Sequence, residues 1–383
     1  MKRMDALMLP SNWQRVRLGD IAEIIGGGTP STQVTSFWNG SINWFTPTEI
    51  GITKYVHKSQ RTITPLGLKK SSAKLLPIGT ILLTSRASIG DCAILKVVAT
   101  TNQGFQSLIP LEKINNEFLY YLMLTLKNKL LKLASGSTFL EVSPNKIKNL
   151  LIPLPPLNEQ IAIANILSTL DHYLYSLDAL ILKKESVKKA LSFELLSQRK
   201  RLKGFNQAWQ RVRLGDICEI TTGSLDANEM VHYGKYRFYT CAKEYYFIDK
   251  YAFDTEAILI SGNGAYVGYV HYYKGKFNAY QRTYVLDNFS EHIIFVKYFL
   301  TMFLQSHIQT NRNEGNTPYI VMGTLKDFEI PLPPLNEQIA IANILSDLDS
   351  EIISLKNKKR QFENIKKALN HDLMSAKIRV LNK

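Results

Sequence analysis

Residues 152–168 read IPLPPLNEQIAIANILS, and residues 330–346 repeat the same seventeen letters. A second repeat, WQRVRLGDI, occupies residues 13–21 and 209–217. Matches of this length do not arise by chance, so the chain is a duplication. The first pair is offset by 178 positions and the second by 196, so the variable segments between the markers differ in length by 18 residues.

Each copy of the longer repeat predicts a long helix that starts after a proline-rich turn. Proline lacks the amide donor and clashes with the preceding turn, so PLPPL lies outside the helix. Asn158 and Asn336 are predicted as N-caps, with Glu159 and Glu337 in the first turns, where a negative charge suits the helix dipole.

Further along each helix, apolar residues recur at alternating spacings of three and four, the 3.5-residue period of a coiled-coil seam. The seam positions are Leu167, Leu170, Leu174, Leu177, Ile181, Leu191 and Leu195 in the first copy, and Leu345, Leu348, Ile352, Leu355, Phe362, Leu369 and Leu373 in the second. Four lysines, Lys184, Lys188, Lys359 and Lys366, interrupt them. We expect the helices to pack on each other as an antiparallel pair; the alternative is that each pairs with a partner protein.

The two variable segments share a skeleton. Residues 80–95 and 257–273 each predict a strand pair around a glycine turn, and residues 116–133 and 293–308 each predict an apolar helix. The expected fold class is therefore α+β: two mixed α/β domains separated by two long antiparallel helices, with an internal pseudo-twofold repeat. The predicted segments are a first domain at 1–152, a first helix at 153–208, a second domain at 209–330 and a second helix at 331–383.

The charge suggests a polyanionic partner. The 383 residues carry a net charge of +15, with a pI near 9.5, and such basic chains commonly bind nucleic acid; a merely basic solvated surface is the alternative. Residues 22–152 have 14 basic and 6 acidic groups, whereas residues 218–330 have 10 and 12. A DNA-binding role for the second domain would therefore have to rest on local patches and polar side chains rather than on net charge.

No catalytic or metal-binding pattern is present in the sequence. There is no GxxxxGK[ST], HExxH or GxSxG motif, and the seven histidines have no metal spacing. Gly262, Gly264 and Gly268 nearly imitate GxGxxG but are expected to form tight turns. The three cysteines share no CxxC spacing, which fits a reducing cytoplasm. No signal peptide or membrane span is expected. We predict a non-catalytic protein with no bound metal.

Amide and guanidinium side chains suit base edges, because Asn and Gln pair with adenine and Arg with guanine, while lysines suit phosphates. Aromatic residues interleave with these groups in the second domain, which holds fourteen of the nineteen tyrosines. The predicted DNA-binding residues are Lys54, Arg61, Lys69, Lys70, Arg86, Asn102, Gln103 and Gln106, followed by Arg237, Tyr239, Lys243, Asn263, Tyr266, Lys276, Asn278, Tyr280, Gln281 and Arg282. For any one of them, an ordinary loop or solvated side chain is the alternative.

The layout resembles the specificity subunit of Type I restriction–modification systems over nearly the whole chain. The stretches that carry the resemblance are 26–50, TSRASIG at 84–90, TNQGFQSLIP at 101–110, ISGNGAYVG at 260–268, GKFNAYQRTYV at 275–285 and both copies of PLPPLNEQ. The resemblance implies two target recognition domains, each reading one half of a split DNA site. It implies a prokaryotic cytoplasmic protein that needs no cofactor of its own and no membrane.

The same resemblance implies that the helices act as a spacer and dock two methyltransferase subunits, which modify adenine N6, with restriction/translocase subunits joining through these. S-adenosylmethionine, ATP and Mg²⁺ would belong to the partners. Because the first helical turns are apolar almost all round, the predicted partner interface is Asn158, Glu159, Gln160, Ile163, Asn336, Glu337, Gln338 and Ile341. Two other readings stay open: a stand-alone DNA-binding regulator, and a coiled-coil scaffold that binds no DNA.

Overall fold

The computed structural model describes residues 9–136, 140–311 and 318–380, which form two compact units. Unit 1 holds the described residues up to Asp178 together with those from Lys358, and unit 2 holds Ala179–Asn357. Each unit thus contains one variable domain and one half of each long helix. The units cut across the four segments expected from the sequence, because both helices contribute to both units.

The long helices are α4 (Leu157–Leu196) and α8 (Leu335–Met374), each of 40 residues. The N-cap prediction was wrong by about one residue, because α4 begins at Leu157 and places Asn158 inside its first turn. There the Asn158 side chain accepts from the N–H of Glu159 at 2.9 Å, and the Pro156 carbonyl accepts from the same N–H. Asn336 and its neighbours repeat this arrangement in α8.

The heptad seam is confirmed by burial. Its most buried members are Leu167, Leu177, Ile181 and Leu195 in α4, and Leu345, Ile352 and Leu373 in α8. A fully buried leucine or isoleucine contributes roughly 2 kcal/mol relative to an exposed one, so the seam is the main source of helix pairing.

The seam lysines bind carboxylates on the facing helix. In unit 1, Lys359 pairs with Asp178 at 2.6 Å and Lys366 pairs with Asp171. These two pairs match a later residue of α8 to an earlier one of α4, so the helix segments run antiparallel.

The seam lysines of unit 2 follow the same rule. Lys184 pairs with Glu351 at 2.8 Å and Lys188 pairs with Asp349. The four lysines that interrupt the apolar pattern therefore fix the register of the antiparallel pair rather than weaken it.

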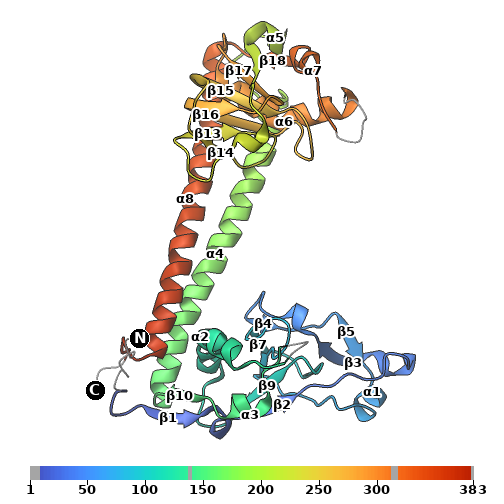
Figure 1. The fold of residues 1–383 in the computed structure, drawn as a ribbon, viewed down its shortest axis with the longest axis vertical. Coiled ribbons are helices and arrows are strands. Elements are labelled where there is room, and N and C mark those ends of the chain that lie inside the picture. Colours follow the sequence, from blue (N-terminus) through green and yellow to red (C-terminus); the bar gives the residue numbers. More distant parts are fainter. Residues whose placement is uncertain (1–8, 137–139, 312–317, 381–383) are drawn as a thin grey trace. The chain divides into compact units, whose positions relative to one another are not determined.

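Within the described residues, the strands of unit 1 belong to three sheets, and Figure 1 labels several of these strands. The five-stranded sheet has the order β2 (Ala22–Gly26), β9 (Gln106–Pro110), β6 (Ile81–Leu83), β7 (Cys92–Leu95), β4 (Tyr55–Val56). A three-stranded sheet has the order β5 (Arg61–Ile63), β3 (Trp38–Phe45), β8 (Ala99–Thr101), and β1 (Gln14–Arg17) pairs with β10 (Leu151–Leu154). The helices are α1 (Pro65–Lys69), α2 (Asn116–Leu133) and α3 (Pro144–Lys148), with short 3-10 turns at Leu18–Asp20, Thr35–Phe37 and Pro47–Glu49.

The domain of unit 2 repeats this plan with a six-stranded sheet. Its order is β12 (Glu219–Thr222), β17 (Thr283–Asp287), β15 (Phe253–Ser261), β16 (Val270–Ala279), β13 (Tyr236–Tyr239), β14 (Tyr246–Ile248). β11 (Gln210–Arg213) pairs with β18 (Glu329–Leu332), and the helices are α5 (Leu214–Ile217), α6 (Ile293–Asn311) and α7 (Met322–Lys326), with a 3-10 turn at Ala227–Glu229. The predicted strand pairs and the predicted helices of both domains are confirmed.

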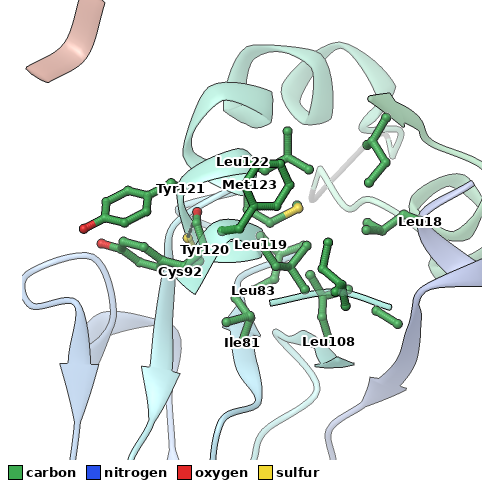
Figure 2. Packing of buried hydrophobic residues seen from close by; sticks show 14 of the residues in the cluster. Leu18, Ile81, Leu83, Cys92, Leu108, Leu119, Tyr120, Tyr121, Leu122 and Met123 are labelled. Carbon is green, nitrogen blue, oxygen red and sulfur yellow. Dashed lines mark hydrogen bonds between the residues drawn. The ribbon is translucent and has the colours of Figure 1, made fainter. Parts of the chain in front are cut away.

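In each unit the buried cluster with the most residues lies between the five- or six-stranded sheet and one helix of intermediate length, α2 or α6, which we call the medium helix. Figure 2 shows this for unit 1, where Leu119, Tyr121 and Met123 of α2 lie with Ile81 and Leu83 of β6 in one buried cluster. Unit 2 buries the corresponding face of α6 against β15 and β17. Within the described ranges, no helix is both long and apolar enough to cross a membrane.

Candidate nucleic-acid interface

The loop between β16 and β17, residues 280–282, is fixed by its backbone. The N–H groups of Tyr280 and Gln281 donate to carbonyls of two other segments, both at 2.9 Å, and the carbonyl of Arg282 accepts from Gly262 at 2.8 Å. The side chains of Gln281 and Arg282 are exposed. The loop therefore presents an amide and a guanidinium from a well-anchored backbone.

Aromatic and cationic side chains interleave elsewhere in the same domain. The Lys243 ammonium lies 5.2 Å from the ring of Tyr266, which is exposed, and the guanidinium of Arg237 lies 4.2 Å from Tyr245 and 4.4 Å from Tyr273. Such pairs hold positive charge beside flat apolar faces. This surface suits a polyanion with stacked bases even though the domain as a whole is slightly acidic.

In unit 1 the loop between β8 and β9, residues 102–105, is anchored in the same way. Asn102 donates its N–H to Phe45 at 3.1 Å, and the carbonyl of Gly104 accepts at 2.8 Å from the segment that follows β6. The exposed Gln103 accepts a hydrogen bond from the Thr29 hydroxyl, which orients its amide.

The two loops are structurally equivalent. Gly104 and Arg282 both accept from the backbone that follows the central strand β6 or β15, and each comes directly after a glutamine. Gln103 and Gln281 therefore occupy the same exposed position in the two units, at the offset of 178 found in the long repeat. The two loops therefore share an exposed glutamine and differ at the next residue, Gly104 in unit 1 and Arg282 in unit 2.

Two exposed lysines of unit 1 precede a segment that packs close to the strand leading into this loop. Lys69 and Lys70 are exposed at the end of α1, and the segment that follows approaches so closely that a Cβ on Gly28 would lie 2.3 Å from Ala73 N. Gly28 in turn donates its N–H to Thr101, the residue before the loop. The backbone after Lys69 and Lys70 is thus linked through Gly28 to the residue before the β8–β9 loop.

Lys54 does not belong to this surface, which corrects the sequence prediction. Its side chain is 11% exposed, and its ammonium pairs with Glu117 and donates to Tyr121 at 2.8 Å and Ser168 at 2.7 Å. These partners use all three ammonium protons, so Lys54 joins the domain to α4 and has no donor left for a phosphate.

Three more predicted residues are buried. Asn278 donates to the Lys250 carbonyl at 3.1 Å, Gln106 lies inside β9, and the hydroxyl of Tyr239 accepts from Arg237 at 3.3 Å. Each stands in a stretch of strand where consecutive residues are buried, so none of the three side chains faces a ligand at the surface. Asn102 is also engaged, because its side chain accepts from the Gly104 N–H at 2.9 Å.

The remaining predicted residues are accessible to different degrees. Arg61 is exposed but packs 3.8 Å from the ring of Trp38. Arg86 pairs with Glu141 at 2.8 Å, and its side chain is 42% exposed. Lys276 is exposed, whereas Asn263 and Tyr280 are half-buried.

The predicted partner interface is mostly interior. Glu159, Gln160, Ile163, Glu337, Gln338 and Ile341 are all buried within their own unit. Gln160 shows the cause: it accepts from Asn115 N–H at 2.8 Å and donates to the carbonyls of Lys113 and Pro155. Asn158 and Asn336 alone remain exposed from that set.

Glu159 is held by residues that the sequence prediction missed. Arg379 donates to it through two nitrogens, at 2.7 and 3.1 Å, and the indole N–H of Trp13 donates at 3.1 Å. This network fastens the start of α4 to the segment after α8 within unit 1.

Unit 2 contains the same network. Arg201 donates to Glu337 at 3.0 and 2.7 Å, and Trp209 donates at 3.2 Å. Arg201 and Arg379 are 178 positions apart, so the repeat offset was a signal that could have identified them.

A second pair of networks joins the medium helices to the seam. In unit 2, Asp349 accepts from Lys188 and from the Tyr298 hydroxyl at 2.6 Å. Burial opposes ionisation, but these hydrogen bonds prevail and lower the pKa of Asp349. Burial and the bond to this carboxylate raise the pKa of Tyr298. Tyr121 and Asp171 form the corresponding bond in unit 1.

The first turns of α4 and α8 do present an apolar surface, formed by other residues than those predicted. Leu157 and Ile161 are 46% and 42% exposed, and their equivalents Leu335 and Ile339 are 53% and 39% exposed. In unit 1 the pair lines an open groove of about 540 Å³. Exposed apolar side chains in contiguous patches mark interaction surfaces.

The fold and these surfaces define a duplicated recognition protein: two domains with equivalent anchored loops, carried on an antiparallel helix pair. Within the described ranges, no group of three or more His, Cys, Asp or Glu is placed to hold a metal ion.

Comparisons with known proteins identify the family of this duplicated chain. The family model for the Type I restriction modification DNA specificity domain matches residues 10–184 and 206–364, and the chain belongs to this family. Specificity subunits are the non-catalytic, DNA-recognising components of Type I restriction systems.

Individual relatives match over most or part of the chain. The chain is 29% identical to the Type I restriction enzyme MjaIX specificity subunit of Methanocaldococcus jannaschii, over 99% of this chain and 96% of that protein. It is 40% identical to the EcoDI specificity subunit of Escherichia coli, over 42% and 35% of the two chains. A crystal structure of a Type I system S subunit from M. genitalium has the same fold, with a TM-score of 0.63 at 19% identity, covering 96% of this chain and 98% of that one.

Proposed function

We propose that the two units read the two halves of a split DNA site, each through the loop cluster around Gln103 or Gln281. The observation that carries this is the equivalence of the two loops: two backbone hydrogen bonds and an exposed glutamine are repeated, but the next residue is Gly104 in unit 1 and Arg282 in unit 2. A protein that recognises two different half-sites needs the same scaffold twice, with different side chains at the DNA-binding positions. In unit 1 the exposed lysines Lys69 and Lys70 supply phosphate contacts. In unit 2 Arg237 and Lys243, which pack against aromatic rings, supply them.

The apolar first turns dock two copies of one partner, a methyltransferase subunit that modifies adenine N6. Leu157 and Ile161 are exposed and recur as Leu335 and Ile339 within an unbroken seventeen-residue identity. Folding does not demand identity at exposed positions, whereas binding the same partner twice does. The restriction/translocase subunits join through the methyltransferases, and S-adenosylmethionine, ATP and Mg²⁺ are bound by the partners in the cytoplasm.

The paired helices set the number of base pairs between the half-sites. Deleting one heptad from the middle of α4 and the facing heptad of α8 keeps the 3.5-residue seam in register. Seven residues span about 10 Å of helix, which corresponds to about three base pairs of B-DNA. Either the spacer changes, or methylation is lost because no site fits; an unchanged spacer would contradict the proposal.

The test of the function is a methylation map. The chain is co-expressed with its methyltransferase partner in a host without N6-methyladenine, and the genome is sequenced by a method that detects this base. We expect one split motif with an unspecified spacer of fixed length. A complex that fails to form, or a contiguous motif, would favour the stand-alone regulator.

A further inference from the structure

Arg282 differs from the other described arginines of unit 2 because its side chain has no partner among the described residues. Within the described residues, its guanidinium makes no hydrogen bond, ion pair or ring contact. The side chain is also exposed. The other described arginines of the unit bind a carboxylate or pack on an aromatic ring: Arg199, Arg201, Arg211, Arg213 and Arg237. An unpaired guanidinium beside aromatic and amide groups is available for a ligand.

The backbone that carries Arg282 is nevertheless held on several sides. Its carbonyl accepts from Gly262 N–H at 2.8 Å and from the Cys241 thiol at 3.3 Å, and the next residue, Thr283, donates its N–H to Tyr280 at 2.8 Å. Binding therefore orders only the side chain, not the loop. A preorganised backbone is the condition under which one side chain can discriminate between ligands.

Unit 1 has no side chain at this position. Gly104 occupies it, and a Cβ there would lie 2.7 Å from Pro47 Cγ and 3.0 Å from Asn102 Oδ1. The preceding glutamine, Gln103 or Gln281, is common to both units. The two loops thus share one amide and differ in one guanidinium, and no hydrogen bond, ion pair or ring contact with a described residue accounts for that guanidinium.

We propose that Arg282 is a specificity-determining residue that reads a guanine in the half-site of unit 2. The planar guanidinium matches the N7 and O6 acceptors of guanine in the major groove, and no other base presents that pair of acceptors. The inference rests on the proposed function, since it names the base that one loop of the DNA surface recognises. The competing use of the same guanidinium is a contact with a backbone phosphate, which carries no sequence information.

The experiment compares methylation motifs for the wild-type complex and for Arg282→Gly and Arg282→Lys, each co-expressed with the methyltransferase. Arg282→Gly introduces the residue that unit 1 carries in the equivalent loop. Arg282→Lys keeps the positive charge but cannot donate two parallel hydrogen bonds to one base. Arg211→Gly is the matched control, because Arg211 is an exposed arginine of the same unit that pairs with Glu329. Circular dichroism of each purified complex shows whether the variants fold.

We expect Arg282→Gly to relax one G·C pair in one half-site, with roughly 10- to 100-fold loss of discrimination at that position and no change in the other half. Arg282→Lys should relax the same pair in part, and Arg211→Gly should leave the motif unchanged. An unchanged motif with uniformly weaker methylation, rescued by Arg282→Lys, would show a phosphate contact and overturn the proposal. Relaxation at an A·T pair, or in both halves, would also overturn it. If the wild type gives no split motif, the proposed function itself fails.

Discussion

The buried carboxylate of Glu337 depends on Arg201, and Arg201→Met tests how strongly. The Glu337 side chain is 0% exposed and receives three hydrogen bonds, two of them from Arg201. Removing the arginine leaves the buried carboxyl group with only the Trp209 donor. Breaking a buried pair in this way costs about 3–5 kcal/mol. Since 1.4 kcal/mol corresponds to a factor of ten, amide exchange limited by opening of unit 2 should accelerate roughly 100-fold or more.

Hydrogen exchange read by mass spectrometry assigns the effect to a unit. We expect faster exchange in peptides from 335–357 for Arg201→Met, and in peptides from 157–178 for the matched variant Arg379→Met. Replacing Glu337 by Met as well should recover much of the stability, because an apolar pair of similar volume needs no hydrogen bonds. If the double variant is no more stable than Arg201→Met alone, or if Arg201→Met costs under about 1 kcal/mol, the reasoning is wrong.

Three further predictions concern the seam and the two proposed surfaces. The pKa of Asp349 is lowered in the folded chain, so its hydrogen bonds stabilise unit 2 above the ordinary pKa of 3.8, and this stability is lost as the pH falls below that value. Acid unfolding followed by circular dichroism should show the loss, and Asp349→Asn should weaken the dependence of stability on pH. Ile161→Asp with Ile339→Asp should weaken methyltransferase binding by tenfold or more in sedimentation or calorimetry while the isolated chain keeps its melting temperature, since both side chains are already solvent-accessible. Lys69→Gln with Lys70→Gln should lower the slope of log affinity against log salt by about two for the assembled complex on DNA, and an unchanged slope would remove these lysines from the phosphate contacts.

Local pattern was enough to predict the helices and their pairing. The seam from Leu167 to Leu195 follows from spacing alone, because a 3.5-residue period leaves one side of a helix needing an apolar partner. The antiparallel sense was an expectation from chain connectivity, which the facing pairs Asp171–Lys366 and Asp349–Lys188 bear out. The limits of each helix were less predictable, since the start at Leu157 depends on the Pro156 carbonyl as acceptor.

Individual site residues were harder to predict, because residue type does not reveal direction. Asn278 and Gln281 are both amides in one stretch, yet one is buried in β16 and the other is exposed in the following loop. Lys54 is of a residue type that binds phosphate, but its ammonium protons are used by Glu117 and Ser168. These partners lie 63 and 114 positions further along the chain. Such pairings depend on which distant segments meet, and neither composition nor spacing records that.

The sequence by itself determined the duplication, the fold class, the helix seam and the family. These rest on periodicity and on identity between two copies, both of which are written along the chain. The tertiary structure alone decided which polar residues face outward and that Gln103 and Gln281 are equivalent. It also decided that Arg282 has no partner among the described residues, whereas Gly104 has no room for a side chain. The physical reason is that charge and hydrogen-bonding capacity belong to a residue, but their availability depends on the partners that folding brings within about 3 Å.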